Sequence, residues 1–178
     1  MTTLCTTPRA LETRHPYMFS ADNLEYSVPK GWFPIFAKLC EDIDFLLGDD
    51  KQAFHWTQLK TKFGSARFYW SLGADSGPLR VDLRTPDGVL SFETDPPGRV
   101  RTDRTLRTMK QITALVHAAE AATKKLCAVC CGEAATVEDT PGFSLPVCRL
   151  HTAERNEPSH AALNLWFGQD EDFSANAQ

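Results

Sequence analysis

Long hydrophobic runs are missing from this 178-residue sequence. No apolar stretch approaches the roughly 20 residues that cross a bilayer, which excludes a membrane-spanning helix. The stretch Met1–Arg9 lacks a hydrophobic signal core, so we expect a cytoplasmic protein with no membrane partner.

Recognised catalytic motifs are missing as well. The sequence contains no glycine-rich phosphate loop and no H-E-x-x-H pair, and no histidine has a serine or cysteine partner in a recognised context. We find no internal repeat and no low-complexity tract. These absences predict a protein that is not an enzyme and that has no evident small-molecule substrate.

What is present is the composition of an ordinary globular protein. Hydrophobic residues make up 42% and charged residues 24%, with a net charge of -4, which excludes wholesale disorder. The length fits one domain, or one domain with a small appendage. The six cysteines of a cytoplasmic chain are expected to be thiols or metal ligands rather than disulfides.

The first predicted element is an amphipathic helix over residues 32–47. Its apolar residues recur every three or four positions, and this stripe includes Phe45. Pro34 fits the first turn, where its missing N–H costs nothing, and Gly48 is expected to end the helix. The acidic residues expected to face solvent on this helix are Glu41, Asp42 and Asp44.

Four strands are expected after this helix. Aromatic and β-branched residues occupy 54–60 and 65–71, on either side of a turn with Phe63 tucked into the core. Apolar and polar residues alternate over 79–84 and return over 89–93, around a Pro-Asp-Gly turn. We predict that the four strands form one antiparallel meander.

Two further helices complete the predicted α+β fold. A long helix begins at Thr102 or Asp103 and runs to about Leu126, and Pro158 opens a short last helix. Residues 1–30 are interpreted as an irregular arm that packs through its aromatic residues, or as a floppy tail. The predicted domains are a core over 1–126 and a zinc-knuckle segment over 127–178 with an acidic tail.

The most specific signal is a pair of ligand motifs, Cys127-Ala-Val-Cys130 and Cys148-Arg-Leu-His151, separated by 17 residues. A two-residue gap lets one tight turn present two ligands to one ion, and zinc takes four such ligands at tetrahedral corners. Gly132 is expected to reverse the backbone after the first motif. We predict one structural Zn²⁺ held by Cys127, Cys130, Cys148 and His151.

Cys131 leaves one alternative open, because it could replace Cys130 as a ligand. Four protein ligands leave no position for water, which argues against catalytic zinc. A zinc deaminase needs H-x-E followed much later by P-C-x-x-C, whereas this chain has His117-x-x-Glu120 and no proline before the cysteines. Cys5 and Cys40 are interpreted as incidental.

Charge is distributed unevenly along the chain. Residues 99–125 contain seven basic and two acidic residues, a net charge of +5, which leaves -9 for the remainder. A row of basic residues on the long helix could meet phosphates, bind an acidic protein or simply remain solvated. The candidate partner-binding residues are the basic Arg104, Arg107 and Lys110 and the acidic Glu41, Asp42 and Asp44.

The segment Lys60-Thr-Lys-Phe-Gly-Ser-Ala-Arg-Phe-Tyr69 resembles a K-E-K-F-G-x-L-R-F-Y pattern. That pattern occurs in a family of small uncharacterised proteins of bacteria, phages and other mobile elements. Members look alike in an upstream Gly-Trp helix start, here Gly31-Trp32, and in a C-terminal CxxCG…CxxH knuckle. Here Cys131 interrupts the C-x-x-C-G pattern, so Gly132 comes one residue late.

The resemblance implies a mobile-element setting in a bacterial host and no established reaction. Within its motif, Lys60, Lys62 and Arg67 are further candidates for partner binding, although the motif also fits a fold signature. Arg67 and Tyr69 share one strand face, which is either exposed or covered by the long helix.

Two hypotheses follow for function. The leading one is a non-enzymatic, zinc-stabilised binding protein, most plausibly a mobile-element inhibitor or immunity-type protein of the anti-CRISPR kind that occludes a protein target. The alternative is a nucleic-acid-binding regulator that uses the basic row and the zinc knuckle.

Overall fold

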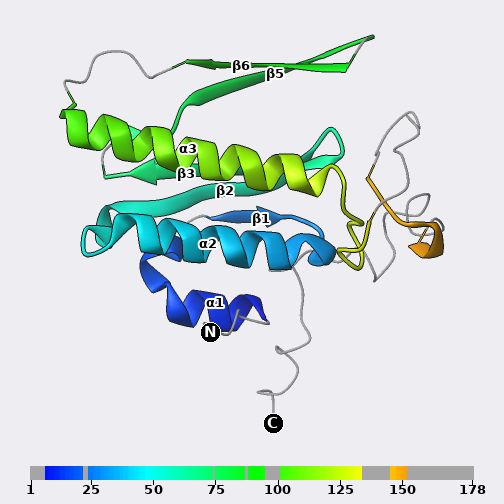
Figure 1. Ribbon diagram of the computed structural model, residues 1–178, viewed down its shortest axis with the longest axis horizontal. Coiled ribbons are helices and arrows are strands. Elements are labelled where there is room, and N and C mark those ends of the chain that lie inside the picture. The colour runs from blue at the N-terminus through cyan, green and yellow to red at the C-terminus, as the bar shows by residue number, and fades with distance from the viewer. Residues whose placement is uncertain are drawn as a thin grey trace.

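The computed structural model describes residues 7–21, 24–73, 75–86, 88–94, 101–133 and 145–151. It has a mixed α+β architecture (Figure 1). The helices and strands are α1 (Pro8–Arg14), β1 (Glu25–Ser27), α2 (Phe33–Leu47), β2 (Phe54–Lys62), β3 (Ser65–Leu72), β4 (Asp75–Ser76), β5 (Leu79–Thr85), β6 (Gly88–Thr94) and α3 (Asp103–Thr123). Short 3-10 turns cover Pro16–Phe19, Lys30–Trp32, Lys51–Ala53 and Arg149–His151.

The two long helices predicted from the spacing of apolar residues are confirmed. Helix α2 ends at Gly48, which adopts a φ of 57° as the helix stop. Helix α3 begins after Thr102, whose hydroxyl accepts a hydrogen bond from the backbone N–H of Thr105 at 3.2 Å. Phe45 is the exception in the predicted stripe of α2, because its side chain is 90% exposed.

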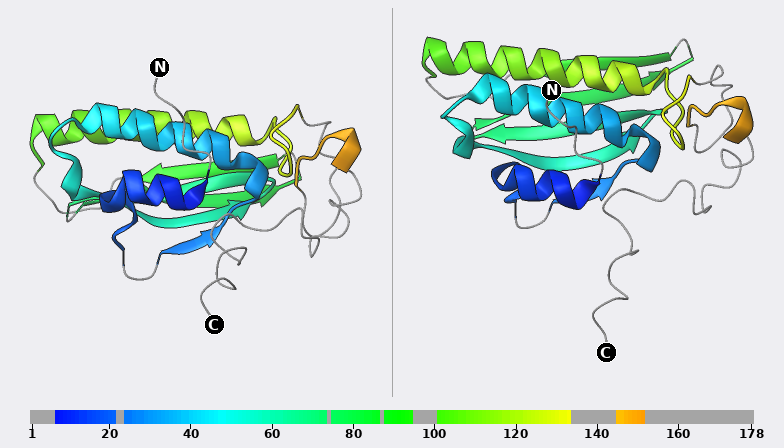
Figure 2. Two further views of the ribbon diagram at one scale, coloured as in Figure 1. Left: turned by 90° about the horizontal axis from the view of Figure 1, so that it is seen from below. Right: turned by 60° about the horizontal axis from the view of Figure 1, so that its bottom comes forward.

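Helices α2 and α3 lie side by side and pack against the main sheet (Figure 2). Phe36 of α2 contacts Trp56 of β2 and Phe68 of β3, with both ring centroids 5.2 Å from its own. Met109, Ile112 and Val116 of α3 are buried in the same core. Phe68 of β3 therefore faces the helices, as the predicted alternation of β3 requires.

The predicted β2–β3 hairpin is confirmed, with Phe54 paired to Leu72 and Lys62 paired to Ser65. Phe63 and Gly64 form the two-residue turn and both have positive φ, at 50° and 70°, as a tight hairpin connection requires. The expectation that Phe63 packs into the core was wrong, because its ring is 38% exposed at this turn.

The four predicted strands do not form one meander. The sheet order is β1-β2-β3-β4, with β1 parallel to β2, while β5 and β6 form a separate two-stranded antiparallel sheet. Helix α3 occupies the edge of β3 that a further strand would have paired with. The N–H groups of Ala66 and Phe68 donate instead to Thr123 Oγ1 and Glu120 Oε1, both at 2.9 Å.

The N-terminal arm is more regular than expected. It contains α1 and β1, and its side chains Leu11 and Met18 are fully buried in the core. Tyr17 and Phe19 pack against that core, as the interpretation of the arm proposed. The short α1 has only one buried residue, so its sequence carries no apolar periodicity from which a helix could be predicted.

Several predicted features lie outside the described residues. They are the last helix from Pro158, the acidic tail and Cys5. Among the helices that the structure describes, none combines the length and the apolar composition that a bilayer crossing needs.

Candidate metal centre

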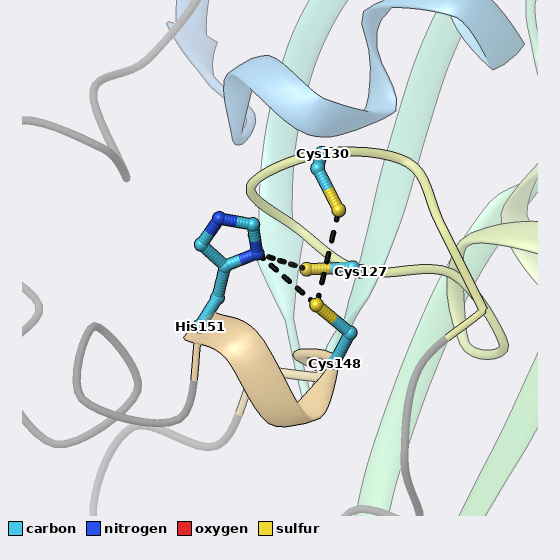
Figure 3. A group of neighbouring side chains, drawn as sticks. All are labelled: Cys127, Cys130, Cys148 and His151. Atoms are coloured by element: carbon cyan, nitrogen blue, oxygen red, sulfur yellow. Dashed lines mark hydrogen bonds between the residues drawn. The ribbon is translucent and has the colours of Figure 1, made fainter.

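The two predicted ligand motifs meet at one end of the molecule (Figure 3). Cys127 and Cys130 lie on the turn that follows α3, and Cys148 and His151 flank the 3-10 turn Arg149–His151. Each residue contributes one ligand atom, and the four atoms all lie within 4.8 Å of one another. These four residues could therefore hold a metal ion.

Two of the separations between the ligand atoms are close to those of tetrahedral coordination. Bond lengths of about 2.3 Å to sulfur and about 2.0 Å to nitrogen place tetrahedral sulfur atoms about 3.8 Å apart and a sulfur–nitrogen pair about 3.6 Å apart. The Sγ atoms of Cys130 and Cys148 are 3.9 Å apart, and Cys127 Sγ lies 3.6 Å from His151 Nδ1. Cys148 Sγ lies somewhat closer to the same nitrogen, at 3.1 Å.

The first ligand turn is closed by backbone hydrogen bonds. The Cys131 N–H donates to the Cys127 carbonyl at 2.9 Å, and the Cys127 N–H donates to the Gly132 carbonyl at 2.6 Å. Cys131 has a φ of 60°, whereas Gly132 is not among the residues with positive φ. The prediction that Gly132 reverses the chain was therefore wrong: Cys131 takes the left-handed position, and Cys130 is the cysteine that joins the cluster.

The surroundings of Cys127 favour a thiolate. Burial opposes ionisation, but backbone hydrogen bonds from Cys148, Cys130 and Val129 outweigh it and lower the pKa of the Cys127 thiol below its ordinary value. The Val129 N–H lies 3.4 Å from the Cys127 sulfur. Burial instead raises the pKa of Cys131, next to the charge of Cys127. The pKa of Cys130, which also joins the cluster, is raised by its neighbours Cys127 and Cys148, so of the two ligands on this turn only Cys127 has a lowered pKa.

The ligand turn is joined directly to the core. Ala128 is fully buried; its N–H donates to the Pro146 carbonyl and its own carbonyl accepts from the Gly31 N–H, both at 2.8 Å. Trp32 Nε1 donates to the carbonyl of Leu126 at 2.9 Å. A Cβ on Gly31 would overlap the Ala128 carbonyl, so only glycine allows this approach.

The three motifs of the resemblance therefore meet around the C-terminal end of α3. Gly31-Trp32 contacts the first ligand turn, and the strand after the Lys-Phe-Gly turn donates to Thr123 through Ala66. Sequence reasoning did not join these motifs, because they are separated by 30 to 90 residues and no local pattern links them. In this chain the Gly-Trp pair is therefore in direct contact with the turn that carries the first two ligands.

Arg67, predicted as a partner-binding residue, is only 1% exposed and cannot reach a partner. Its Nε donates to Asp82 Oδ2 at 3.1 Å, and its Nη1 donates to Ser65 and to the Ala66 carbonyl. Asp82 comes from β5, so the hairpin rather than the long helix supplies its main partner. This ion pair explains why an arginine sits at a covered position of β3.

The three acidic residues of α2 do not form one solvated face. Glu41 lies 3.0 Å from Arg14 of α1, and Asp44 accepts from the Tyr17 hydroxyl at 2.8 Å and from Lys51 at 3.1 Å. Asp42 alone among them pairs with a residue of its own helix, Lys38. The expectation that all three face solvent was therefore wrong for Glu41 and Asp44, which attach the N-terminal segment to α2.

The predicted basic row on α3 does lie on the surface. Arg104, Arg107 and Lys110 are exposed, although Arg104 is paired with Asp50. Lys60 and Lys62 are half-buried, with their ammonium groups 4.9 Å from the Tyr69 ring centroid and 5.2 Å from that of Phe63. These basic residues are accessible to a partner.

One surface feature was not predicted. The outward face of the β5–β6 hairpin consists of large apolar side chains that are 49–60% exposed: Leu79, Val81, Leu83, Leu90 and Phe92. The signal was present in the alternation over 79–84, but we placed these residues in a single four-stranded meander and gave their apolar face no role.

Comparisons with known proteins add no relative: no family model, no curated protein and no solved structure matches the chain. The resemblance to mobile-element proteins stays a prediction. Function is therefore inferred from the metal centre and from the surfaces of the described residues.

Proposed function

We propose that this chain is a non-enzymatic binding protein, stabilised by one structural zinc ion, that recognises a protein partner through the outer face of the β5–β6 hairpin. The observation that carries this proposal is the orientation of the hairpin, which turns its charged face inward and its apolar face toward solvent.

Zinc is the metal that the ligand set favours. Three cysteine sulfurs and one histidine nitrogen are a common structural zinc set, and four protein ligands leave no position for a substrate or a water. The ligand turn packs against Gly31 and Trp32, so metal binding would order the segment after α3 against the start of α2. We assign zinc this structural role.

The two faces of the hairpin differ sharply. Register pairs Val81 with Phe92 and Leu83 with Leu90, which places these four side chains on the outer face. The inner face carries Asp82, whose side chain is 1% exposed and bonded to Arg67. A hairpin held to its own fold by ion pairs leaves its apolar surface for another molecule.

The area of this face distinguishes the candidate occupants. Five large side chains at about half exposure offer roughly 400–500 Å² of apolar surface, which matches the size of patches that mark interaction sites. Two copies packed face to face would bury roughly 900 Å² in total, below the roughly 1,200 Å² of a stable interface. A partner must therefore also cover part of the polar rim around this face, and we assign that role to a different folded protein.

Nucleic acid is a poorer match for the same surface. Nucleic-acid binding depends on hydrogen bonds and charges directed at phosphates. The outer face is aliphatic apart from Phe92, and the exposed Arg107 and Lys110 lie on α3 rather than on this hairpin face. The nucleic-acid regulator remains the alternative, and it would use that basic row.

The resemblance to phage and mobile-element proteins supports a narrower version of the proposal. In that version the partner is a protein of the bacterial host, and this chain acts as an inhibitor or immunity-type protein that occludes a site on it. An apolar face of limited size bordered by polar surface suits such occlusion.

The test compares partner capture by three purified forms of the chain. The double variant Val81→Thr with Phe92→Thr removes one apolar pair of the outer face and retains β-forming side chains. Phe45→Ser is the matched control, because it removes an even more exposed phenylalanine, on α2. Zinc content and circular dichroism establish that both variants fold.

We expect one host protein to bind the wild type and the Phe45→Ser variant, and to bind the double variant at least about tenfold more weakly when purified. Equal binding to the double variant would overturn the proposed surface. A dimer in solution that the double variant abolishes would make a second copy the occupant. Bound nucleic acid that Arg107→Glu with Lys110→Glu removes would establish the alternative function.

A further inference from the structure

A cavity of about 330 Å³ lies between the inner face of the β5–β6 hairpin and helix α3. Side chains bridge it: Arg80 of β5 pairs with Glu120 of α3, and Glu93 of β6 lies 2.7 Å from His117 Nε2. Arg67 of β3 also borders the cavity. Residues of β3, β5, β6 and α3 therefore line one cavity that is open to solvent, on the opposite side of the hairpin from its apolar face.

The carboxylates of Glu93 and Glu120 line this cavity and that of Asp82 lies beside its arginines, and all three already have partners. Asp82 accepts from Arg67 Nε at 3.1 Å, Arg80 Nε at 3.0 Å and the Ser91 hydroxyl at 2.6 Å. Glu120 accepts from the Phe68 N–H as well as from Arg80. Little acceptor capacity is therefore left in these two carboxylates for a cationic ligand.

The donors are not all used. Arg67 makes its recorded hydrogen bonds through Nε and Nη1, which leaves Nη2 of a side chain that is 1% exposed yet borders the cavity. Lys124 borders the same cavity and is exposed, and its side chain has no hydrogen bond or ion pair with any residue that the structure describes. A protonated His117 would add a third donor through Nδ1, because its Nε2 faces Glu93.

We propose that this cavity binds a small phosphorylated compound, with its phosphate group held by Arg67, Lys124 and His117. Arginine and lysine donors that converge from β3 and α3 suit an anion with several terminal oxygens better than a planar group. The volume exceeds that of inorganic phosphate, so it admits an attached organic group such as a pentose. The ligand would touch both the hairpin and α3, and so join them.

The experiment titrates the zinc-loaded full chain with inorganic phosphate and with ribose 5-phosphate at constant ionic strength, followed by amide NMR shifts. Chloride at the same ionic strength is the blank. Lys124→Ala removes the unpaired donor, and Lys125→Ala is its matched control, because Lys125 is the adjacent exposed lysine and does not border the cavity. Neither lysine lies on the outer face of the hairpin, so the outcome is independent of partner binding.

We expect saturable binding of phosphate in the millimolar range and tighter binding of ribose 5-phosphate, with shifts confined to β3, β5, β6 and α3. Lys124→Ala should weaken both by about tenfold, and Lys125→Ala by less than about twofold. The proposal is overturned if neither compound saturates by about 20 mM, or if the two lysine variants weaken binding equally, which would mean attraction to the general charge of α3.

Discussion

Replacing Cys131 with glycine should stabilise the protein without reducing its metal content. Cys131 has a φ of 60°, and its N–H closes the ligand turn on the Cys127 carbonyl. A left-handed conformation costs a residue with a Cβ about 1–2 kcal/mol. Glycine avoids that cost but loses about 0.5–1 kcal/mol more backbone entropy on folding. The net expectation is a gain of about 0.5–1 kcal/mol.

Urea unfolding of the zinc-saturated protein measures this gain as a rise in the midpoint at constant slope. Cys131→Ala is the matched control, because it removes the thiol and keeps the Cβ and therefore the strain. We expect it to leave the midpoint close to that of the wild type. A glycine variant that is less stable, or no more stable than the alanine variant, would refute the conformational reasoning. A glycine variant that loses its zinc would make Cys131 the ligand in place of Cys130.

Three further predictions concern the packing and charge of the core. Asp82→Asn should destabilise the protein by about 3–5 kcal/mol, because it leaves the buried Arg67 without its carboxylate partner. The control Asp42→Asn, on the surface of α2, should lower the free energy of unfolding by less than about 0.5 kcal/mol. Urea unfolding of both variants measures these differences. Burial alone would raise the pKa of Asp82, but hydrogen bonds from Ser91 and Arg67 and the charges of Arg67 and Arg80 lower it to about 2. The resulting stabilisation should be complete above the unfolded pKa of about 3.9 and lost as the pH falls through about 2. The difference in free energy of unfolding between the wild type and Asp82→Asn should therefore shrink by about 1–2 kcal/mol as the pH falls from about 3.9 to about 2. A difference that stays constant over this pH range would contradict the prediction. Gly31→Ala should lower the free energy of unfolding by about 1–3 kcal/mol and weaken zinc binding, because the added Cβ overlaps the Ala128 carbonyl in the ligand turn. A calorimetric zinc titration that gives the wild-type affinity would contradict this link between Gly31 and the metal centre.

Local patterns predicted the elements whose causes are local. The spacing of apolar residues located α2 and α3, and alternation located the strands of both hairpins. The four ligands were predicted because a two-residue gap places two side chains on one turn, a geometry that needs no tertiary information. For these elements the pattern that predicts the structure lies within a single helix, strand pair or turn.

The failures involve partners that are distant in sequence. The meander was wrong because Glu120 and Thr123, more than 50 residues away, occupy the edge of β3. Alternation placed Arg67 opposite the core residues of β3 but could not reveal that Asp82 would cover it. The same limit applied to Glu41 and Asp44, which looked solvated until α1 and Tyr17 were placed beside them.

The wrong meander also explains why the apolar hairpin face was missed. If all four strands share one sheet, Leu79, Val81 and Leu83 belong to its packed side. Once β5 and β6 separate from β3, the same alternation turns these residues outward and Arg80 and Asp82 inward. Whether this apolar face is exposed thus depends on which strands pair with each other, and not on composition.

The most direct measurement for the central claim is the metal content of the full chain, purified without chelator and analysed by native mass spectrometry. The four-ligand centre predicts one zinc per chain in the wild type and in Cys131→Ala, and loss of that zinc in Cys130→Ser. Less than half an equivalent of zinc in well-folded wild-type protein, or full zinc retention in Cys130→Ser, would contradict the metal centre.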